Sequence, residues 1–396
     1  MLKKLSLAAG SGVLLFLILE GICSGLLAVQ HSWSSRSRRS LSGPSMQYDR
    51  ELGWVSVPNF YESNYYAPGV YLKINSQGFR AREEFQEQVP AGRLRMICSG
   101  DSFTFGEGVD NDHTWCQHLE SVDGRLQTVN MAMSGYGVDQ MYVWYLRKIP
   151  SLRYDVQVVA FITEDFRRMQ LTTLVGYGKP VLKLQNGALV TENVPVPRKS
   201  RIVQWIGSKS VYVRELSSIK LLGSLVGRML PNREAVTSSG PTGSQAQILD
   251  KMIETLQETN RQKNSVLVFA YLPTALHDYE QDEPAMAWQA WIRAECARRG
   301  VLFVDLVDDF QKLPLTMRDG MFICPHSVHY FAEAPGHYND QGHEYVAKQL
   351  YTRLISIPEV AAKLNLHSED RVAKRRTDSS SQSSALAMGH RTESRN

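Results

Sequence analysis

The chain has 396 residues, of which 43% are hydrophobic and 21% are charged, so it can bury a large core and is not a disordered protein. Lysine and arginine number 44 and aspartate and glutamate number 40, and this near balance argues against nucleic acid as the main partner. Five cysteines without a C-x-x-C pair do not indicate a disulfide scaffold or a structural zinc site.

The first feature along the chain is an apolar segment from Leu5 to Val29, which follows two lysines. A helix of about 20 apolar residues spans a bilayer core. The segment is longer than the apolar part of a usual cleaved signal peptide, the competing interpretation, and no clean A-x-A cleavage site follows it. We therefore predict a transmembrane signal anchor at residues 5–29. Basic residues are nearly balanced on its two sides, so charge alone leaves the orientation open.

Composition sets the other boundaries. Residues 1–45 form the anchor and a Ser/Arg-rich linker, and residues 367–396 form a polar tail that cannot offset its own ordering entropy. The folded domain is predicted at 46–366. Within it, a segment of about 172–243 contains a hairpin signal at Asn186-Gly187 and then an amphipathic stretch. This insertion is either a lid over the site or a surface subdomain without a catalytic role.

The rest of the domain alternates short apolar runs with helical patterns. The predicted strands are Leu94–Cys98, Val156–Ile162, Val266–Leu272 and Val301–Val304. The predicted helices are His113–Leu119, Gln140–Lys148, Gln247–Arg261, Pro284–Arg299 and Asp340–Leu354. This alternation predicts an α/β fold, in which a mostly parallel sheet is covered by helices on both faces. In such sheets, active sites lie at the carboxyl ends of the strands.

Two segments carry residues suited to nucleophilic catalysis. Gly100-Asp101-Ser102 follows the first of these strands at once, so the Ser102 hydroxyl is expected at the rim of the sheet, with backbone N–H groups nearby for a developing oxyanion. The loop from Gly336 to His343 precedes the last helix, which either Asn339 or Asp340 can cap. A histidine in this loop can reach across the rim and accept the serine proton.

These segments resemble the SGNH, or GDSL-like, serine hydrolase family. Its first block resembles Gly-Asp-Ser-Phe-Thr-Phe-Gly-Glu-Gly-Val at 100–109, its second block Asn-Met-Ala-Met-Ser-Gly-Tyr-Gly at 130–137, and its last block the His-Tyr-Asn run that begins at His337. Upstream, residues 49–54 and 75–80 are similar to the lead-in of membrane-anchored bacterial members. The resemblance covers most of residues 48–354, apart from the insertion.

The resemblance implies a flavodoxin-like three-layer α/β/α sandwich and ester hydrolysis through an acyl-enzyme. His337 would deprotonate Ser102, and the backbone N–H groups of Ser102 and Gly135 would stabilise the oxyanion. No metal ion and no organic cofactor is required.

The chain departs from the family at the oxyanion hole. An asparagine of the family's third block completes the hole, whereas Glu164 occupies that place here. Glu164 either is protonated and donates to the oxyanion, or it turns away and the hole has fewer donors, with Arg167 or Arg168 as substitutes. In the plainest interpretation, Glu164 and Asp165 simply pair with these two arginines.

The triad acid is the second departure. The family places an aspartate three residues before the catalytic histidine, and that position is Ala334 here. Glu333 lies one residue further back and is the candidate that we carry forward. As an alternative, Asp340 and His343 have the D-x-x-H spacing themselves. We prefer His337, because the residues that follow it keep the family register, and His343 is then structural.

Together, these features favour a membrane-anchored serine esterase that acts on a small-molecule or carbohydrate ester outside the cytoplasm, in the periplasm or at the cell exterior. An O-acyltransferase is the alternative within the same fold, since an acyl-enzyme can pass its acyl group to a sugar hydroxyl. A catalytically inactive domain that binds an envelope polysaccharide or a partner protein is the alternative of another class. The departures at Glu164 and Ala334 favour the inactive domain.

Overall fold

The computed structural model describes residues 43–174, 177–198, 240–275, 283–324 and 334–364. All but Gly43 and Arg198 belong to one compact unit, which comprises residues 44–197 and 238–396. The predicted anchor at 5–29, the amphipathic part of the insertion, Glu333 and the polar tail lie outside the described residues. Within the described ranges, no helix combines the length and the apolar character needed to cross a bilayer.

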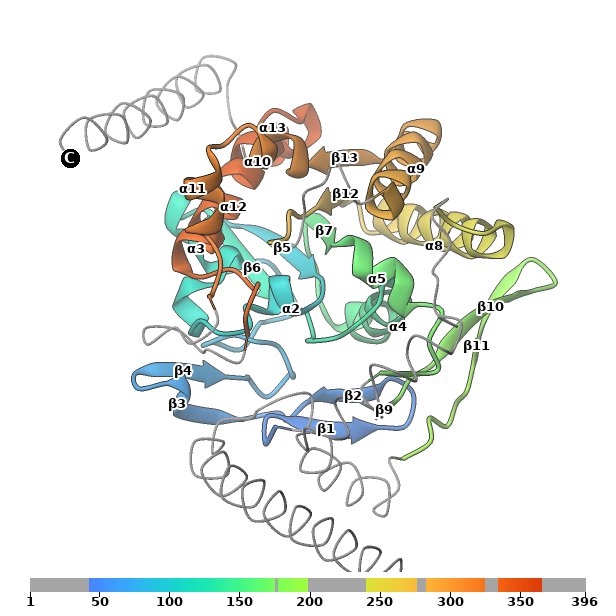
Figure 1. Ribbon diagram of the computed structural model, residues 1–396, viewed down its shortest axis with the longest axis horizontal. Coiled ribbons are helices and arrows are strands. Elements are labelled where there is room, and N and C mark those ends of the chain that lie inside the picture. Colours follow the sequence, from blue (N-terminus) through green and yellow to red (C-terminus); the bar gives the residue numbers. More distant parts are fainter. Residues whose placement is uncertain (1–42, 175–176, 199–239, 276–282, 325–333, 365–396) are drawn as a thin grey trace, which may run out of the picture. The chain divides into compact units, whose positions relative to one another are not determined.

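Five parallel strands form the central sheet (Figure 1): β5 (Leu94–Ser99), β6 (Leu126–Asn130), β7 (Val156–Phe161), β12 (Val266–Tyr271) and β13 (Leu302–Asp305). Their order in the sheet is β13-β12-β7-β5-β6. This is the doubly wound order of flavodoxin-like folds, in which the chain changes direction between the first and third strands, here β5 and β7. The predicted α/β fold with a parallel sheet is confirmed.

Helices cover both faces of the sheet (Figure 1). On one face lie α3 (Trp115–Val122) and α12 (Asp340–Leu354), which share a core cluster with the side chains of Met96, Val158 and Val268. On the other face, Val159 and Phe269 pack toward α4 (Val138–Lys148), α8 (Gly243–Gln262) and α9 (Glu283–Arg299). Strands buried on both faces need a nearly continuous apolar sequence, which is why apolar runs alone predict β5, β7, β12 and β13.

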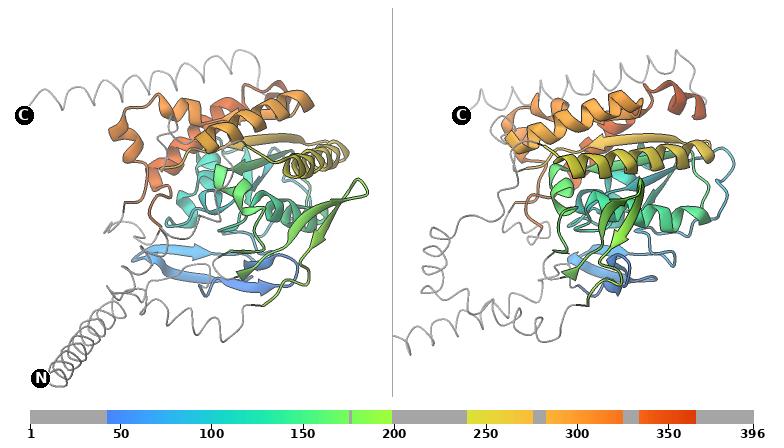
Figure 2. Two further views of the ribbon diagram at one scale, coloured as in Figure 1. Left: turned by 45° about the vertical axis from the view of Figure 1, so that its right-hand side comes forward. Right: turned by 90° about the vertical axis from the view of Figure 1, so that its right-hand side faces the viewer.

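Short elements complete the unit. The helical ones are α2 (Ser102–Phe105), α5 (Thr163–Arg168), α10 (Val307–Gln311), α11 (Leu315–Asp319), α13 (Pro358–Lys363) and two 3₁₀ turns, η2 (Asn111–His113) and η3 (Ile149–Ser151). The antiparallel hairpins are β1 (Met46–Asp49) with β2 (Gly53–Ser56), β3 (Tyr61–Ala67) with β4 (Val70–Lys73), and β8 (Thr173–Leu174) with β9 (Tyr177–Gly178). Figure 2 shows the two N-terminal hairpins, in blue, at the opposite end of the unit from α9.

The described part of the insertion contains the predicted hairpin. Strands β10 (Val181–Gln185) and β11 (Ala188–Glu192) pair antiparallel, with Gln185 opposite Ala188. The two turn residues, Asn186 and Gly187, have φ angles of 51° and 76°. Positive φ at both positions is the signature of a type I′ turn, which joins twisted strands with a two-residue loop. The hairpin prediction is confirmed.

Other boundaries differ from the prediction for local reasons. Strand β6 was not predicted, because Leu-Gln-Thr-Val-Asn holds only two large apolar residues. Helix α3 begins at Trp115 rather than His113, because the side chain of Thr114 caps it by accepting from the backbone N–H of Gln117. Helix α12 has the predicted bounds, and its cap is Asn339, which accepts from the N–H of Gly342 at 3.0 Å.

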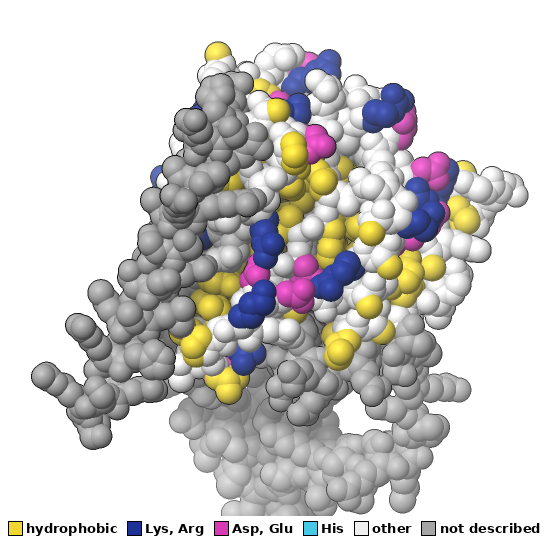
Figure 3. Space-filling model, turned by 90° about the horizontal axis from the view of Figure 1, so that it is seen from above, with side chains coloured by type: hydrophobic (Ala, Val, Ile, Leu, Met, Phe, Trp, Pro, Cys, Tyr) yellow, Lys and Arg dark blue, Asp and Glu magenta, His cyan; other side chains and the backbone are white. Residues whose placement is uncertain are grey.

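Charges on the surface are largely paired. Figure 3 shows one face of the unit, on which lysine and arginine side chains lie beside aspartate and glutamate side chains. Ion pairs of helix α9 include Arg293–Asp305 at 2.7 Å and Arg299–Glu295 at 2.9 Å. The near balance of charge seen in the sequence therefore appears here as local pairs of opposite sign.

His343 packs α12 against the start of α3. It is 1% exposed, and its Nδ1 accepts a hydrogen bond from the backbone N–H of Trp115 at 3.2 Å. Burial, together with the positive charge of Arg80, holds the pKa of His343 well below its usual 6.5. The imidazole is therefore neutral in the folded protein under conditions in which the unfolded chain already binds a proton.

This linkage predicts that the free energy of unfolding decreases as the pH falls below about 6.5, by at most about 1.4 kcal/mol per pH unit from this residue. His343→Asn should remove that share of the pH dependence, since an amide oxygen can accept from Trp115 but does not titrate. Denaturant unfolding of both proteins at pH 7.5 and pH 5.5 measures the effect. An equal loss of stability in the two proteins would contradict it.

Candidate active site

Ser102 is placed by a tight turn at the end of β5. Asp101 caps the short helix α2 with its side chain, which accepts from the backbone N–H of Phe103 at 2.9 Å, and Ser102 is the first residue of that helix. Gly100 precedes them, and a Cβ there would collide with Thr104 and come within 3.0 Å of the Ala160 carbonyl oxygen. Only glycine fits this turn, which holds Ser102 at the switch point between β5 and β7.

His337 lies in the loop before α12 and faces Ser102. Its Nε2 is 2.8 Å from Ser102 Oγ, and its Nδ1 is 3.3 Å from the carbonyl oxygen of Ala334. The ring of Phe103 stacks on the imidazole at 4.9 Å between centroids. A carbonyl can only accept, so Nδ1 carries the proton, and Nε2 is free to accept from the serine hydroxyl. The two residues that the sequence proposed as nucleophile and base are therefore in hydrogen-bond contact.

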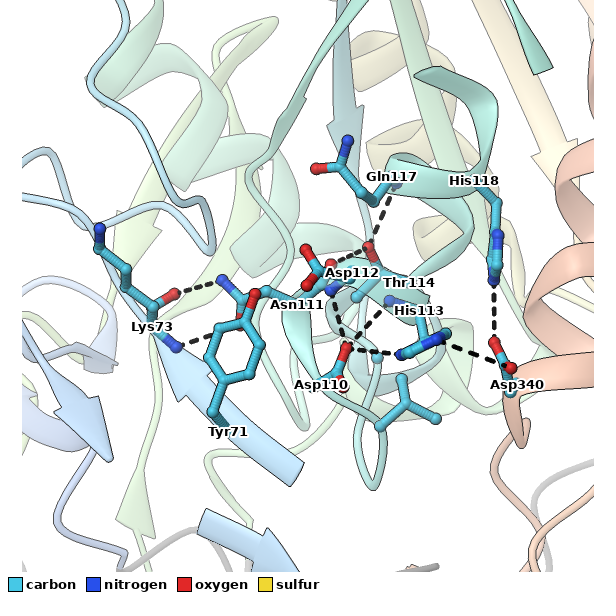
Figure 4. Close-up of polar contacts among 12 residues, drawn as sticks. Tyr71, Lys73, Asp110, Asn111, Asp112, His113, Thr114, Gln117, His118 and Asp340 are labelled. Carbon is cyan, nitrogen blue, oxygen red and sulfur yellow. Dashed lines mark hydrogen bonds and ion pairs between the residues drawn. The ribbon is translucent and has the colours of Figure 1, made fainter. Parts of the chain in front are cut away.

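Neither candidate for the triad acid is seen in contact with a catalytic histidine. Glu333 lies outside the described residues, and the described acceptor for Nδ1 of His337 is the backbone carbonyl of Ala334. The alternative pair of Asp340 and His343 does not form. Figure 4 shows that Asp340 faces two other histidines, with Oδ1 at 3.0 Å from Nε2 of His118 and Oδ2 at 3.8 Å from Nε2 of His113.

The loop after β6 holds Gly135 beside the serine turn. The backbone N–H of Met133 donates to the Gly100 carbonyl at 3.1 Å, which ties the two loops together. Trp54 holds the loop from the other side, by donating from Nε1 to the Ser134 carbonyl at 3.0 Å. Gly135 itself has a φ angle of 78°, which favours glycine. Its backbone N–H and that of Ser102 donate to no other described residue, so both remain available to a ligand.

Arg80 fixes the chain that follows α2. This buried arginine donates to the carbonyl oxygens of Phe105 at 2.7 Å, Gly106 at 2.6 Å and Val109 at 2.5 Å. Its guanidinium also lies over the Phe105 ring, 4.9 Å from the centroid. The sequence alone indicated no structural role for the segment at residues 75–80. In the structure, its arginine donates to the last carbonyl of α2 and to two carbonyls of the chain that follows it.

Glu164 lies on helix α5 and pairs with an arginine of the same helix. Its carboxylate pairs with Arg167 at 3.2 Å, and its side chain is 46% exposed. The interpretation in which Glu164 and Asp165 pair with the neighbouring arginines matches the structure.

Asp165 and Arg168 form the second of these pairs. Nη1 of Arg168 is 2.8 Å from Asp165 Oδ1, and it also lies 3.2 Å from Oδ2 of Asp101, beside the serine. Burial, and then the negative charge of Asp101, raise the pKa of Asp165 well above its usual value. Burial disfavours the guanidinium charge, but the two carboxylates outweigh it and raise the pKa of Arg168. The link to Asp101 had no local signal in the sequence, since 67 residues separate the partners.

Comparisons with known proteins leave the family open. No protein-family model matches the chain, and no curated protein does. The search of solved structures matched a member of the lipolytic protein G-D-S-L family from Veillonella parvula DSM 2008 (11% identity, 67% of this chain and 98% of that chain, TM-score 0.34). It also matched the acetyl xylan esterase AlAXEase (14%, 66% and 100%, 0.36) and TesA (11%, 66% and 98%, 0.37). Likenesses at this level carry no argument about activity, which therefore rests on the site.

The exposure of the Glu164–Arg167 pair predicts a weak interaction. In a double-mutant cycle with Glu164→Asn and Arg167→Gln, the coupling free energy should be below about 1 kcal/mol. Denaturant unfolding of the four proteins measures it. A coupling of several kcal/mol would show that Glu164 is a buried, structurally required charge.

Proposed function

We propose that this chain is a serine esterase, in which Ser102 is the nucleophile and His337 is the general base. The observation that carries the proposal is the 2.8 Å contact between Ser102 Oγ and His337 Nε2 at the carboxyl end of the sheet. A hydroxyl is a weak nucleophile unless a base takes its proton as it attacks. The imidazole tautomer set by Ala334 presents the lone pair that this step needs.

The reaction has two halves. In the first, Ser102 Oγ attacks the acyl carbon while its proton passes to Nε2 of His337, and the imidazolium then gives that proton to the departing alcohol. In the second, His337 takes a proton from water as the water oxygen attacks the acyl-serine, and Ser102 regains its proton when the acid leaves. The net change is hydrolysis of one ester bond.

Two backbone N–H groups would stabilise the charge that develops on the acyl oxygen. Those of Ser102 and Gly135 are the candidates, because neither donates to another described residue and hydrogen bonds hold their loops together. Fixed donors of this kind favour the transition state, since they need no reorganisation as charge appears. With Glu164 paired to Arg167, this hole has no side-chain donor from the place of the family's asparagine.

The substrate and the location of the enzyme are part of the proposal. The motifs resemble those of esterases that act on small-molecule and carbohydrate esters, and we assign a substrate of this class. The apolar segment at residues 5–29 would anchor the chain in a membrane, with the catalytic domain in the periplasm or at the cell exterior.

Ser102→Ala should lower turnover of a chromogenic acetyl ester by the purified protein by about a millionfold. Removal of the nucleophile leaves only the oxyanion donors and binding. Ser151→Ala, which changes an exposed serine in η3, is the matched control and should keep the wild-type rate. If Ser102→Ala keeps more than a tenth of the wild-type activity, Ser102 is not the nucleophile.

The proposed anchor is tested with a reporter fused after Leu366. We expect the fusion protein to fractionate with membranes and to be active only with a reporter that functions outside the cytoplasm. Deletion of residues 2–29 should release it from the membrane fraction. Activity of a cytoplasm-only reporter would show that the arginines at positions 36, 38 and 39 set the opposite orientation.

A further inference from the structure

We infer that Arg168 is a positioning residue. It holds the serine turn (residues 100–102, after β5) and the oxyanion loop (residues 131–137, after β6) in one arrangement. The inference rests on the proposed esterase function and adds a residue to which the sequence assigned no such role. Among the described residues, Arg168 forms no hydrogen bond with Ser102 Oγ or His337 Nε2, the two atoms that react. It acts through the two segments that carry Ser102 and Gly135.

The contacts of one nitrogen atom carry this inference. Nη1 of Arg168 lies 3.2 Å from Oδ2 of Asp101 and 3.2 Å from the carbonyl oxygen of Tyr136. Asp101 caps the helix that begins with Ser102, and Tyr136 follows Gly135. A single guanidinium on α5 therefore joins the loops that follow β5, β6 and β7, and any shift of one loop against another breaks a hydrogen bond.

Close packing supports the same arrangement independently. Gly137 is the N-cap of helix α4, and a Cβ there would lie 2.9 Å from the Asp165 carbonyl oxygen and 3.0 Å from Cβ of Arg168. The backbone of the loop thus rests against α5 with no room for a side chain. Such contact leaves little freedom to the loop while α5 keeps its place.

The positive charge of Arg168 has a second effect, which acts on the attack of Ser102 Oγ on the acyl carbon. Asp101 is fully buried, and its Oδ2 is also 3.5 Å from Ser102 Oγ. A buried carboxylate without a cation would oppose negative charge on the attacking oxygen and on the oxyanion, because the attenuation by solvent is weak there. Arg168 supplies that cation, and the second buried carboxylate, Asp165, holds the guanidinium in place at 2.8 Å.

The experiment compares Arg168→Gln and Arg168→Lys with Arg261→Gln, the matched control, which changes an exposed arginine of α8 that pairs with Glu258. Two readouts are taken on the wild-type protein and each variant: kcat and KM for a chromogenic acetyl ester, and hydrogen–deuterium exchange of residues 131–137. The amide of Met133 is the most direct reporter, since it bonds to Gly100 across the two loops.

We expect Arg168→Gln to lower kcat by about 10- to 100-fold with KM within about twofold, which is the effect of misplaced catalytic groups. Exchange at 131–137 should become faster. Arg168→Lys keeps the charge but not the planar fork, so its kcat should lie between the two. Arg261→Gln should keep both wild-type values. Removal of a buried cation is destabilising, so if Arg168→Gln does not unfold cooperatively, Arg168→Lys decides by the same two criteria.

A folded Arg168→Gln protein with kcat within twofold of wild type, or with unchanged exchange at 131–137, overturns the inference. If only Arg168→Lys folds, a wild-type kcat together with unchanged exchange overturns it. Failure of the proposed function has a different signature, which is absence of turnover by the wild-type protein. In that case the exchange readout still decides whether Arg168 ties the loops, since it does not depend on catalysis.

Discussion

The hydrogen bond between Ser102 and His337 joins residues that are 235 positions apart, and the rest of the site is arranged around it. Such a bond forms only if two loops meet at one edge of the sheet with an accuracy of a few tenths of an ångström. The doubly wound order of strands brings the loops to the same edge. Gly100 allows the tight turn before Ser102, and the Asn339 cap fixes where α12 begins, three residues after His337.

Buried polar groups keep these loops in register. Arg80 satisfies three carbonyls after α2, Trp54 holds the Ser134 carbonyl, and Arg168 contacts both Asp101 and Tyr136. Each donor sits on a different segment, with Arg80 in the loop after β4, Trp54 on β2 and Arg168 on α5, and each reaches backbone carbonyls at the rim of the sheet. Buried apolar side chains such as Met133 and Tyr136 anchor the loop after β6, and the directional hydrogen bonds from the scaffold add to that packing and define the path of its backbone.

The sequence was informative where function or burial imposes a local pattern. Continuous apolar runs predicted four of the five strands, and the Asn186-Gly187 pair predicted its hairpin, because both depend on neighbouring residues alone. The sequence did not predict strand β6, since three of its five residues are polar. Ser102 and His337 were found because each lies in a motif with several neighbours of its own. The pairing of Glu164 with Arg167 is also local, since the two residues lie three positions apart on α5, and the sequence offered it as one interpretation. The tie from Arg168 to Asp101 depends on three-dimensional placement, which a single sequence does not encode in any short stretch.

The central claim is that Ser102 is a nucleophile because His337 is its base. The most direct measurement is mass-spectrometric mapping of the protein after reaction with a fluorophosphonate, in which the attacking oxygen displaces fluoride from phosphorus and becomes covalently labelled. The account predicts one adduct, on the peptide that contains Ser102, which forms far more slowly in His337→Ala. Labelling at another residue, or labelling of Ser102 at the same rate without His337, would contradict it.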